Sequence, residues 1–123
     1  MSARWIGAAW AAFAAVLALS VHARSAATGQ ELFEKRCGGC HALDRDKEGP
    51  RLGGVYGRTA GSVDTFEYST ALRQSHVVWN EAALEKWLAD PESLVPGNDM
   101  AFHVEKAEER RAIIDYLKQS SGR

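Results

Sequence analysis

Two cysteines and a histidine stand close together in the sequence Cys37-Gly38-Gly39-Cys40-His41. The spacing C-x-x-C-H is the signature of c-type haem attachment. Two thiols three positions apart on one helical turn can each add to a haem vinyl group, which forms two thioethers and fixes the ring. The imidazole that follows would point toward the iron, and the two glycines would leave the approach of the porphyrin uncrowded. The motif therefore predicts one covalently bound haem c, with His41 as an axial ligand of the iron.

Three other interpretations of these residues stay open at this point. A thioredoxin-like redox pair would belong to a βαβ pattern, and none is visible in the sequence. A zinc site needs four ligands. The motif supplies three of them, and His76 or His103 would have to be the fourth. A structural disulfide between Cys37 and Cys40 would leave the adjacent histidine unexplained.

Met100 follows a loop sequence, Pro96-Gly97-Asn98-Asp99, and not a helical pattern. A thioether is a soft axial ligand of haem iron and raises its reduction potential relative to two imidazoles. We therefore expect Met100 to be the second axial ligand. A methionine that fills a gap in the core is the alternative interpretation. His76 and His103 are rival ligands, which we expect to lie in loops or at the surface.

The first 23 residues have the composition of a secretory signal peptide. A short start carrying Arg4 is followed by an apolar stretch over 5–21, and Val21-His22-Ala23 has the small residues that suit signal peptidase. We predict cleavage after Ala23, with a cut after Ala27 as the alternative, so that residues 24–123 form the mature domain. The protein would then be periplasmic, with no stable membrane insertion. An uncleaved anchor is the other interpretation, since the apolar stretch is at the short limit for a membrane span.

The remaining sequence has room for one small domain with a modest core. The full chain of 123 residues carries 15 Lys and Arg against 16 Asp and Glu, which gives a formal net charge of −1. No run of Lys and Arg follows one face of a predicted element. The composition therefore argues against a nucleic-acid partner.

Helical patterns with start signals surround the motif. A capping box begins at Thr28, and Asn80 is a good N-cap for a later helix. The predicted elements are helices over 29–37, 80–89 and 107–119, one or two turns near 68–74, and irregular loops over 43–63 and 91–99. The last helix is expected to bury Ile113, Tyr116 and Leu117. Because no alternating strand pattern occurs, the sequence predicts an all-α fold of three main helices and long loops.

With these residues placed, the chain resembles a class I cytochrome c, of the mitochondrial type and its bacterial periplasmic relatives, over the range Thr28–Lys118. In that family a glycine at the position of Gly29 lets the first and last helices cross closely. The carbonyl of the proline matched by Pro50 accepts a hydrogen bond from the axial imidazole, which orients the ring. The resemblance also implies haem-pocket roles for four further residues: Arg58, Tyr68, Trp79 and Asn98.

Several positions depart from the mitochondrial pattern. The loop after the haem motif is shorter, Leu72 and Trp87 replace an asparagine and a tyrosine, and Asn98 replaces a threonine that bonds a haem propionate. The segment 92–99 lacks the lysines with which mitochondrial proteins dock acidic partners. A mitochondrial-type oxidase or a strongly acidic protein is therefore not the expected partner.

The resemblance implies a monohaem carrier of single electrons between redox proteins outside the cytoplasm. If imidazole and thioether fill both axial positions, no site remains for a substrate, so we expect no enzymatic activity. Contacts with the donor and acceptor proteins should be small and transient. Two alternatives are a dedicated haem subunit of a periplasmic dehydrogenase, and a five-coordinate haem enzyme of the peroxidase kind in which Met100 does not bind iron.

Overall fold

The computed structural model describes Ser2 and residues 26–122, so the predicted leader, apart from Ser2, lies outside the described residues. The described part contains helices α1 (Gly29–Arg36), α2 (Thr70–Arg73), α3 (Glu81–Ala89), α4 (Pro91–Leu94) and α5 (Ala107–Ser121). The single β pairing within these residues is an isolated bridge between Thr59 and Val78. The prediction of an all-α fold with three main helices and long loops is confirmed.

Helices α1 and α3 begin where the sequence supplies capping groups. The Thr28 hydroxyl accepts a hydrogen bond from the backbone N–H of Glu31 at 3.2 Å, and the Glu31 carboxylate accepts one from the N–H of Thr28, which completes the capping box. The side chain of Asn80 accepts from the N–H of Ala83 at 2.9 Å at the start of α3. Each bond satisfies a backbone donor that the first helical turn leaves without a partner.

The predicted loop over 91–99 is wrong in its first part, because Pro91–Leu94 forms the one-turn helix α4. Asp90 caps this turn by accepting from the N–H of Ser93. Proline is favoured at the first helical position, where its missing N–H costs nothing. The same Asp90-Pro91 pair therefore ends α3 and starts α4.

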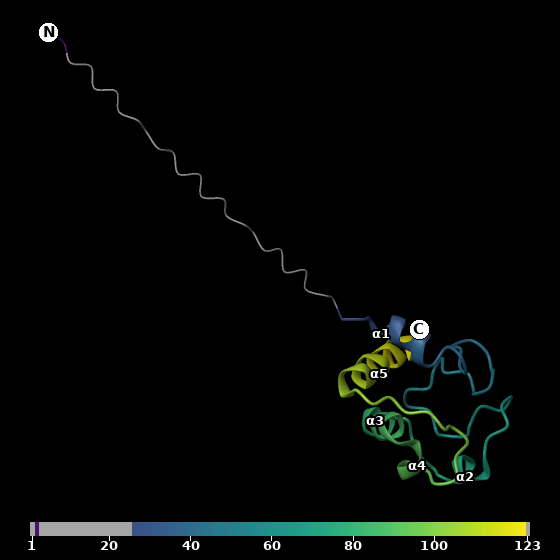
Figure 1. The fold of residues 1–123 in the computed structure, drawn as a ribbon. Helices are drawn as coiled ribbons and strands as arrows, with labels where there is room; N and C mark the ends of the chain where they lie inside the picture. Colours follow the sequence, from purple (N-terminus) through teal and green to yellow (C-terminus); the bar gives the residue numbers. More distant parts are fainter. Residues whose placement is uncertain (1, 3–25, 123) are drawn as a thin grey trace.

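The first and last helices cross closely at Gly29, as the resemblance implied. A Cβ atom at this position would overlap the carbonyl oxygen of Ala112 and lie 2.9 Å from the Cβ of Tyr116. Beside the crossing, the rings of Phe33 and Tyr116 pack with their centroids 5.4 Å apart. Figure 1 shows α1 and α5 at one end of the molecule, with α2 and α4 at the other. Any side chain at Gly29 would therefore force this crossing apart.

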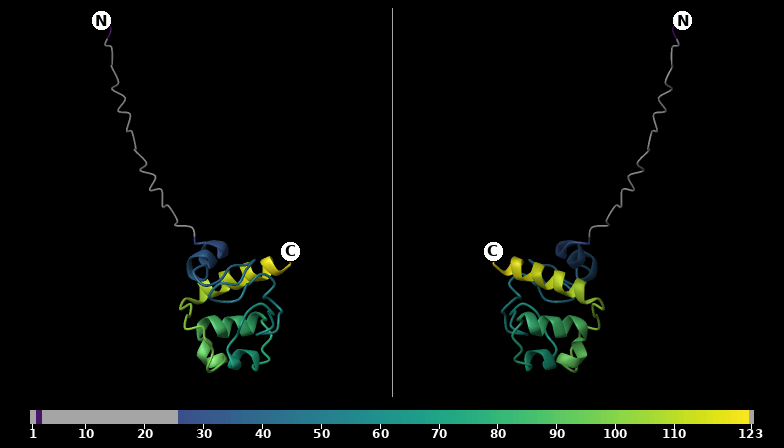
Figure 2. Two further views of the ribbon diagram at one scale, coloured as in Figure 1. Left: turned by 90° about the vertical axis from the view of Figure 1, so that its right-hand side faces the viewer. Right: turned by 90° about the vertical axis from the view of Figure 1, so that its left-hand side faces the viewer.

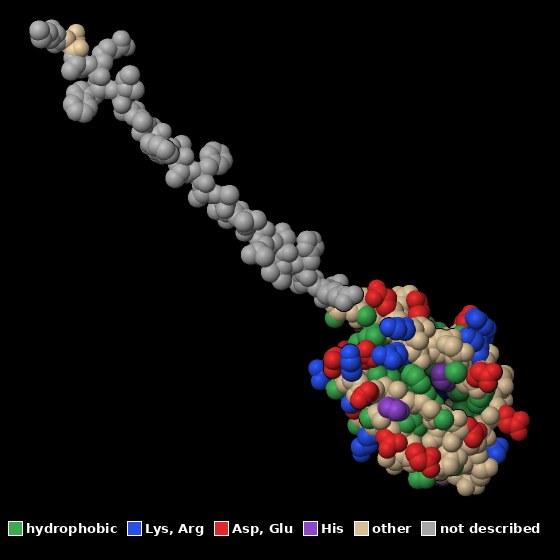
Figure 3. Space-filling model, viewed as in Figure 1, with side chains coloured by type: hydrophobic (Ala, Val, Ile, Leu, Met, Phe, Trp, Pro, Cys, Tyr) green, Lys and Arg blue, Asp and Glu red, His purple; other side chains and the backbone are tan. Residues whose placement is uncertain are grey.

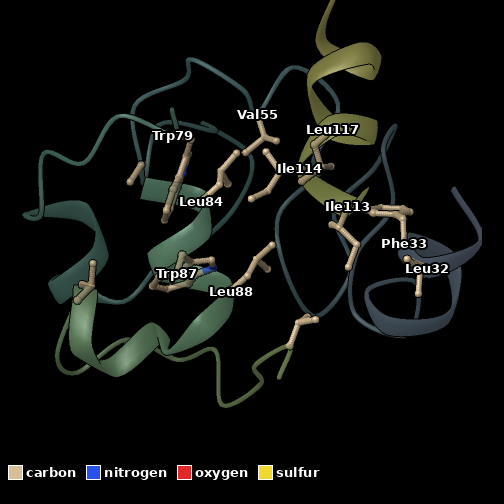
Figure 4. Close-up of a cluster of buried hydrophobic side chains, with 13 residues drawn as sticks. Leu32, Phe33, Val55, Trp79, Leu84, Trp87, Leu88, Ile113, Ile114 and Leu117 are labelled. Carbon is tan, nitrogen blue, oxygen red and sulfur yellow. The ribbon is translucent and has the colours of Figure 1, made fainter. Parts of the chain in front are cut away.

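The side chains of the buried hydrophobic cluster come from α1, α3, α5 and the loops between them. In Figure 2, α3 lies between the α1–α5 pair and the two short helices. Figure 4 shows Leu32, Phe33 and Ile113 on one side of the cluster and Trp79 and Trp87 on the other. The helix α5 buries Ile113, Ile114 and Leu117, whereas Tyr116, predicted to be buried, is only partly covered.

No helix in the range 26–122 is long and apolar enough to cross a lipid bilayer.

Candidate functional site

The buried cluster does not close on itself but lines a cavity of about 830 Å³. This volume lies within the usual range for small-molecule and cofactor sites. Eight of the nine predicted site residues line the cavity: Cys37, Cys40, His41, Pro50, Arg58, Tyr68, Trp79 and Met100. The ninth, Asn98, is not part of the wall. In Figure 3, hydrophobic side chains gather around the hollow at the centre of the face, with a histidine among them. The histidines His76 and His103 do not line the cavity.

The imidazole of His41 is held in one orientation. Its Nδ1 lies 2.8 Å from the carbonyl oxygen of Pro50. A carbonyl oxygen only accepts, so Nδ1 carries the proton and donates, which leaves the Nε2 lone pair free. Burial lowers the pKa of His41 and keeps the ring neutral, and neutral imidazole is the form that binds metals. The structure therefore presents a fixed nitrogen donor at the cavity wall.

Gly49 belongs to this site, although it was not among the predicted site residues. A Cβ atom at Gly49 would overlap the ring of His41, lying 2.7 Å from both ring nitrogens. The ring therefore packs against bare backbone. The backbone N–H of Gly49 also donates to the carbonyl of Cys40 at 2.8 Å, which closes the shortened loop against the motif. The only sequence signal was its place next to Pro50.

The two cysteines lie on a turn that continues from α1. The N–H groups of Cys40 and His41 both donate to the carbonyl of Cys37, at 3.1 and 2.8 Å. The cysteines form no disulfide. Burial, together with the neighbouring Cys40, raises the pKa of Cys37 to about 11, so the thiol is uncharged at neutral pH. A redox-active cysteine has a lowered pKa, so the raised pKa of Cys37 argues against a thioredoxin-like pair.

The described residues also contain no group of three His, Cys, Asp or Glu side chains that could hold a metal ion. The zinc interpretation therefore finds no fourth ligand in the described part of the chain.

The two glycines of the motif differ in their surroundings. A Cβ atom at Gly38 would overlap the carbonyl of Glu34, so Gly38 is needed for a local reason, whereas a Cβ atom at Gly39 would have no other atom within 4 Å. Only Gly39 leaves the open approach that the sequence suggested for both glycines.

Met100 reaches the cavity from a loop that other side chains shape. The backbone N–H of Met100 donates to Oδ1 of Asn98 at 2.7 Å. The amide nitrogen of Asn98 donates to the carbonyl of Val95 at 2.9 Å and to Glu92 at 3.4 Å. The side chain of Asn98 is thus used within the loop, and it lies outside the cavity wall that the resemblance gave it. Glu92, a residue not predicted for the site, takes part in the same group of bonds.

One part of the wall carries polar hydrogen atoms without partners. Arg58 donates to the carbonyls of Arg51 and Gly53, at 2.9 and 3.3 Å, and forms no ion pair with a carboxylate among the described residues. The hydroxyl of Tyr68 accepts from the N–H of Val63 at 3.2 Å, and its own proton has no acceptor in residues 26–122. The indole N–H of Trp79 likewise has no partner there, although the residue is buried. Burial lowers the pKa of Arg58 and raises the pKa of Tyr68.

These features fit a haem. A cation, a phenol and an indole N–H suit the two propionates, because buried acceptors need donors. Buried side chains of the core line the cavity: Val55, Trp79, Leu84, Trp87, Leu88, Ile113 and Leu117. The imidazole nitrogen and the thioether of Met100 supply a donor set that is common for haem iron.

Comparison with known proteins gives the same answer over nearly the whole described chain. The family model "Cytochrome c" matches residues 26–121. The cytochrome c of Chlamydomonas reinhardtii is 39% identical over 99 residues, which cover 77% of this chain and 88% of that protein. The cytochrome c2 iso-2 of Magnetospirillum molischianum is 41% identical over 85 residues, covering 67% of this chain and 88% of that protein.

Among solved structures, cytochrome cH from Methylobacterium extorquens superposes with a TM-score of 0.70 and 39% identity, covering 74% of this chain and 94% of that one. The chain belongs to the cytochrome c family, with the class I fold, one covalently bound haem c and the function of a one-electron carrier.

Proposed function

We propose that thioethers to Cys37 and Cys40 attach the haem, and that His41 Nε2 and the Met100 sulfur fill both axial positions. The observation that carries this proposal is the 2.8 Å bond from His41 Nδ1 to Pro50, which leaves Nε2 free at the wall of a cavity that both cysteines and Met100 also line. With both positions filled, no substrate can reach the iron, and the protein transfers electrons without catalysing a reaction on a substrate.

The haem supplies the exchange of one electron between the ferric and ferrous states. The residues of the chain would keep the surroundings of the haem the same in both states. Pro50 and Gly49 hold the imidazole, and the apolar side chains exclude water, so little rearrangement accompanies the change in charge. Arg58 and Tyr68 would hold the propionates with hydrogen bonds. These fixed groups favour fast transfer, because few dipoles must reorient.

An optical spectrum of the protein, matured in an export-competent host that attaches haem, tests this proposal. The haem should stay with the polypeptide in acid acetone. The oxidised form should show the weak far-red band of thioether-ligated ferric haem, and Met100→Ala should lose the band and bind cyanide readily. A wild-type protein that lacks the band and binds carbon monoxide at once would instead be a five-coordinate haem enzyme.

The rim of the cavity supports a small and transient contact with donor and acceptor proteins. Phe102 is 41% exposed and lines the cavity edge, and Cys40 is also exposed. Lys35 and Arg36 contribute positive charge to the lining, and Glu48, Glu67 and Asp99 contribute negative charge. With both signs present, electron-transfer rates should change little with ionic strength. A steep loss of rate with added salt would contradict this.

A dedicated haem subunit of a periplasmic dehydrogenase is the alternative for the partner. Such a subunit would stay bound to one enzyme, whereas a free carrier would purify alone. Affinity purification from the native host distinguishes the two. Co-elution of a larger dehydrogenase in a fixed ratio would identify the subunit.

We also propose that residues 1–23 direct export to the periplasm and are removed. This segment has the charged start, apolar centre and small-residue end of a signal peptide. The mass of the mature protein tests the cut after Ala23 against the cut after Ala27. A full-length chain found in the membrane fraction would instead indicate an anchor.

A further inference from the structure

The loop that carries Met100 has few internal supports. Between Asp99 and His103, the bond from the N–H of Met100 to Asn98 Oδ1, at 2.7 Å, is the only hydrogen bond within the described residues. The next backbone bond fastens Val104, whose N–H donates to the carbonyl of Leu88 at 2.7 Å. The position of Met100 therefore depends on Asn98.

Asn98 is in turn held from α4. Its amide nitrogen donates to the carbonyl of Val95 at 2.9 Å and to the Glu92 carboxylate at 3.4 Å. The same carboxylate accepts the backbone N–H of Gly97 at 3.0 and 3.2 Å. Gly97 has a φ of 83°, a conformation that favours glycine and sharply turns the chain. Glu92 thus fastens both residues of the turn that leads to Met100.

We propose that Glu92 and Asn98 are positioning residues for Met100, forming a brace (Glu92, Gly97, Asn98) that sets how readily the thioether leaves the axial position. This inference rests on the proposed axial role of Met100. An added ligand can bind the ferric iron only after the loop swings away from the cavity. The brace belongs to the closed loop, so its bonds must break first and add to the free energy of opening.

The resemblance did not suggest this role. It gave Asn98 a place beside a haem propionate, and it marked position 92 only as one that lacks a lysine. In this chain the Glu92 carboxylate stabilises the loop, since it accepts hydrogen bonds from the N–H of Gly97 and the side-chain amide of Asn98. The acidic residue is therefore part of the way this protein holds its methionine.

Imidazole binding to the ferric holoprotein, followed in the optical spectrum, measures the opening. We expect Glu92→Ala to bind imidazole roughly fivefold more tightly than wild type, since each lost bond is modest. Glu92→Gln keeps an oxygen that can accept from Gly97, so its affinity should stay within about twofold of wild type. Asp115→Ala is the matched control, because it removes an exposed carboxylate that makes no side-chain hydrogen bond in the described structure.

Amide hydrogen exchange gives a second readout that does not depend on the added ligand. In Glu92→Ala the amides of Gly97 and Met100 should exchange faster, while amides in α5 keep their protection. Asn98→Ala should speed exchange at Met100 more than at Gly97. A variant that merely destabilised the whole domain would instead speed exchange everywhere.

The outcomes separate the two proposals. If wild type lacks the thioether band, the axial role of Met100 fails, and the brace with it. If wild type has the band and Glu92→Ala matches Asp115→Ala in both imidazole affinity and exchange at Gly97 and Met100, the brace alone is overturned. The brace is supported if Glu92→Ala binds imidazole more tightly and exchanges faster only at Gly97 and Met100, and if Glu92→Gln restores wild-type behaviour in both measurements.

Discussion

The two walls that carry the proposed axial ligands are built differently. On the histidine side, residues 37–50, the ring of His41 is bonded through Nδ1 to Pro50 and packed against the backbone of Gly49. On the methionine side, residues 91–104, the side chain of Met100 makes no hydrogen bond in the described structure. Its loop is shaped by exposed bonds from Glu92 and by Asn98.

The difference separates two tasks. A bond that tight packing reinforces is costly to break, whereas exposed bonds such as those to Glu92 each add little to stability. The histidine side can therefore hold the cofactor permanently, and the methionine side can be adjusted without loss of the fold. Substitutions on the histidine side should therefore reduce haem attachment or the amount of folded protein. Substitutions on the methionine side should alter ligand exchange at the iron and the local stability of the loop.

The largest expected effect is the loss of covalent haem on the histidine side. The double substitution Cys37→Ser with Cys40→Ser removes both sulfurs that we propose as attachment points, so acid acetone should extract essentially all remaining haem. Met100→Ala, on the methionine side, should keep its haem in the same extraction. Covalent haem in the double variant would show that the attachment lies elsewhere.

The second-largest expected effect is the loss of stability in Gly49→Ala, because the added Cβ would overlap the ring of His41. We expect a loss of about 3 kcal/mol in the free energy of unfolding, measured with guanidinium, since neither the ring nor the backbone can move without breaking the bond to Pro50. Gly122→Ala is the control, since its added carbon would make only an ordinary contact, 3.9 Å from the carbonyl oxygen of Gln119, and the residue does not line the cavity. Equal stability of the two variants would mean that His41 is not held by packing.

The third prediction concerns Arg110, which stabilises the C-terminal end of the methionine side. Its guanidinium donates to Glu85 at 2.6 Å and to the carbonyls of Val104 and Glu105 at 2.8 Å, with only 13% of the side chain exposed. Arg110→Ala should lower the free energy of unfolding by about 2 kcal/mol, because it leaves these acceptors unpaired. The side chain of the neighbouring Arg111 makes no hydrogen bond within residues 26–122, so Arg111→Ala should change stability by less than about 0.5 kcal/mol in the same denaturation experiment.

The smallest expected effect is a pH dependence at the start of the methionine side. Hydrogen bonds from the hydroxyl and the backbone N–H of Ser93 lower the pKa of Asp90 below its ordinary value of 3.8. The unfolded chain therefore takes up this proton at a higher pH than the folded protein does. The contribution to stability is complete above about pH 5 and is lost as the pH falls through the folded-state pKa.

Asp90→Asn should accordingly flatten the acid end of the stability curve, measured as the unfolding midpoint between about pH 5 and 2. The exposed Asp115→Asn should leave the slope unchanged. If both variants follow the wild-type slope, the cap of α4 does not contribute to acid sensitivity.

Local sequence was enough to predict the main helices and the haem attachment motif. The capping box at Thr28, the cap at Asn80 and the C-x-x-C-H spacing all act over three or four residues, so neighbouring residues determine them. The single-turn helix α4 was missed because its cap and its proline also read as a stop signal for the preceding helix. The range of the last helix came within two residues of the observed end.

The resemblance supplied the haem-pocket residues, and Asn98 is the one among them that does not line the cavity. Asn98 was expected beside a propionate, but its two polar atoms are used by Met100, Val95 and Glu92. Sequence spacing locates a residue in a loop without giving the direction of its side chain. That direction depends on which donors and acceptors the folded loop brings within reach.

The sequence by itself determined the helical elements, the cysteine pair with its histidine, and the methionine in a loop. Tertiary structure decided that Arg110 reaches Glu85, that the N–H of Val104 bonds to the carbonyl of Leu88, and that the ring of Phe33 packs against Tyr116. The physical reason is range. Bonds within one turn follow from adjacent residues, but contacts such as Arg36 with Glu109, 73 positions apart, exist only once packing has brought distant segments together.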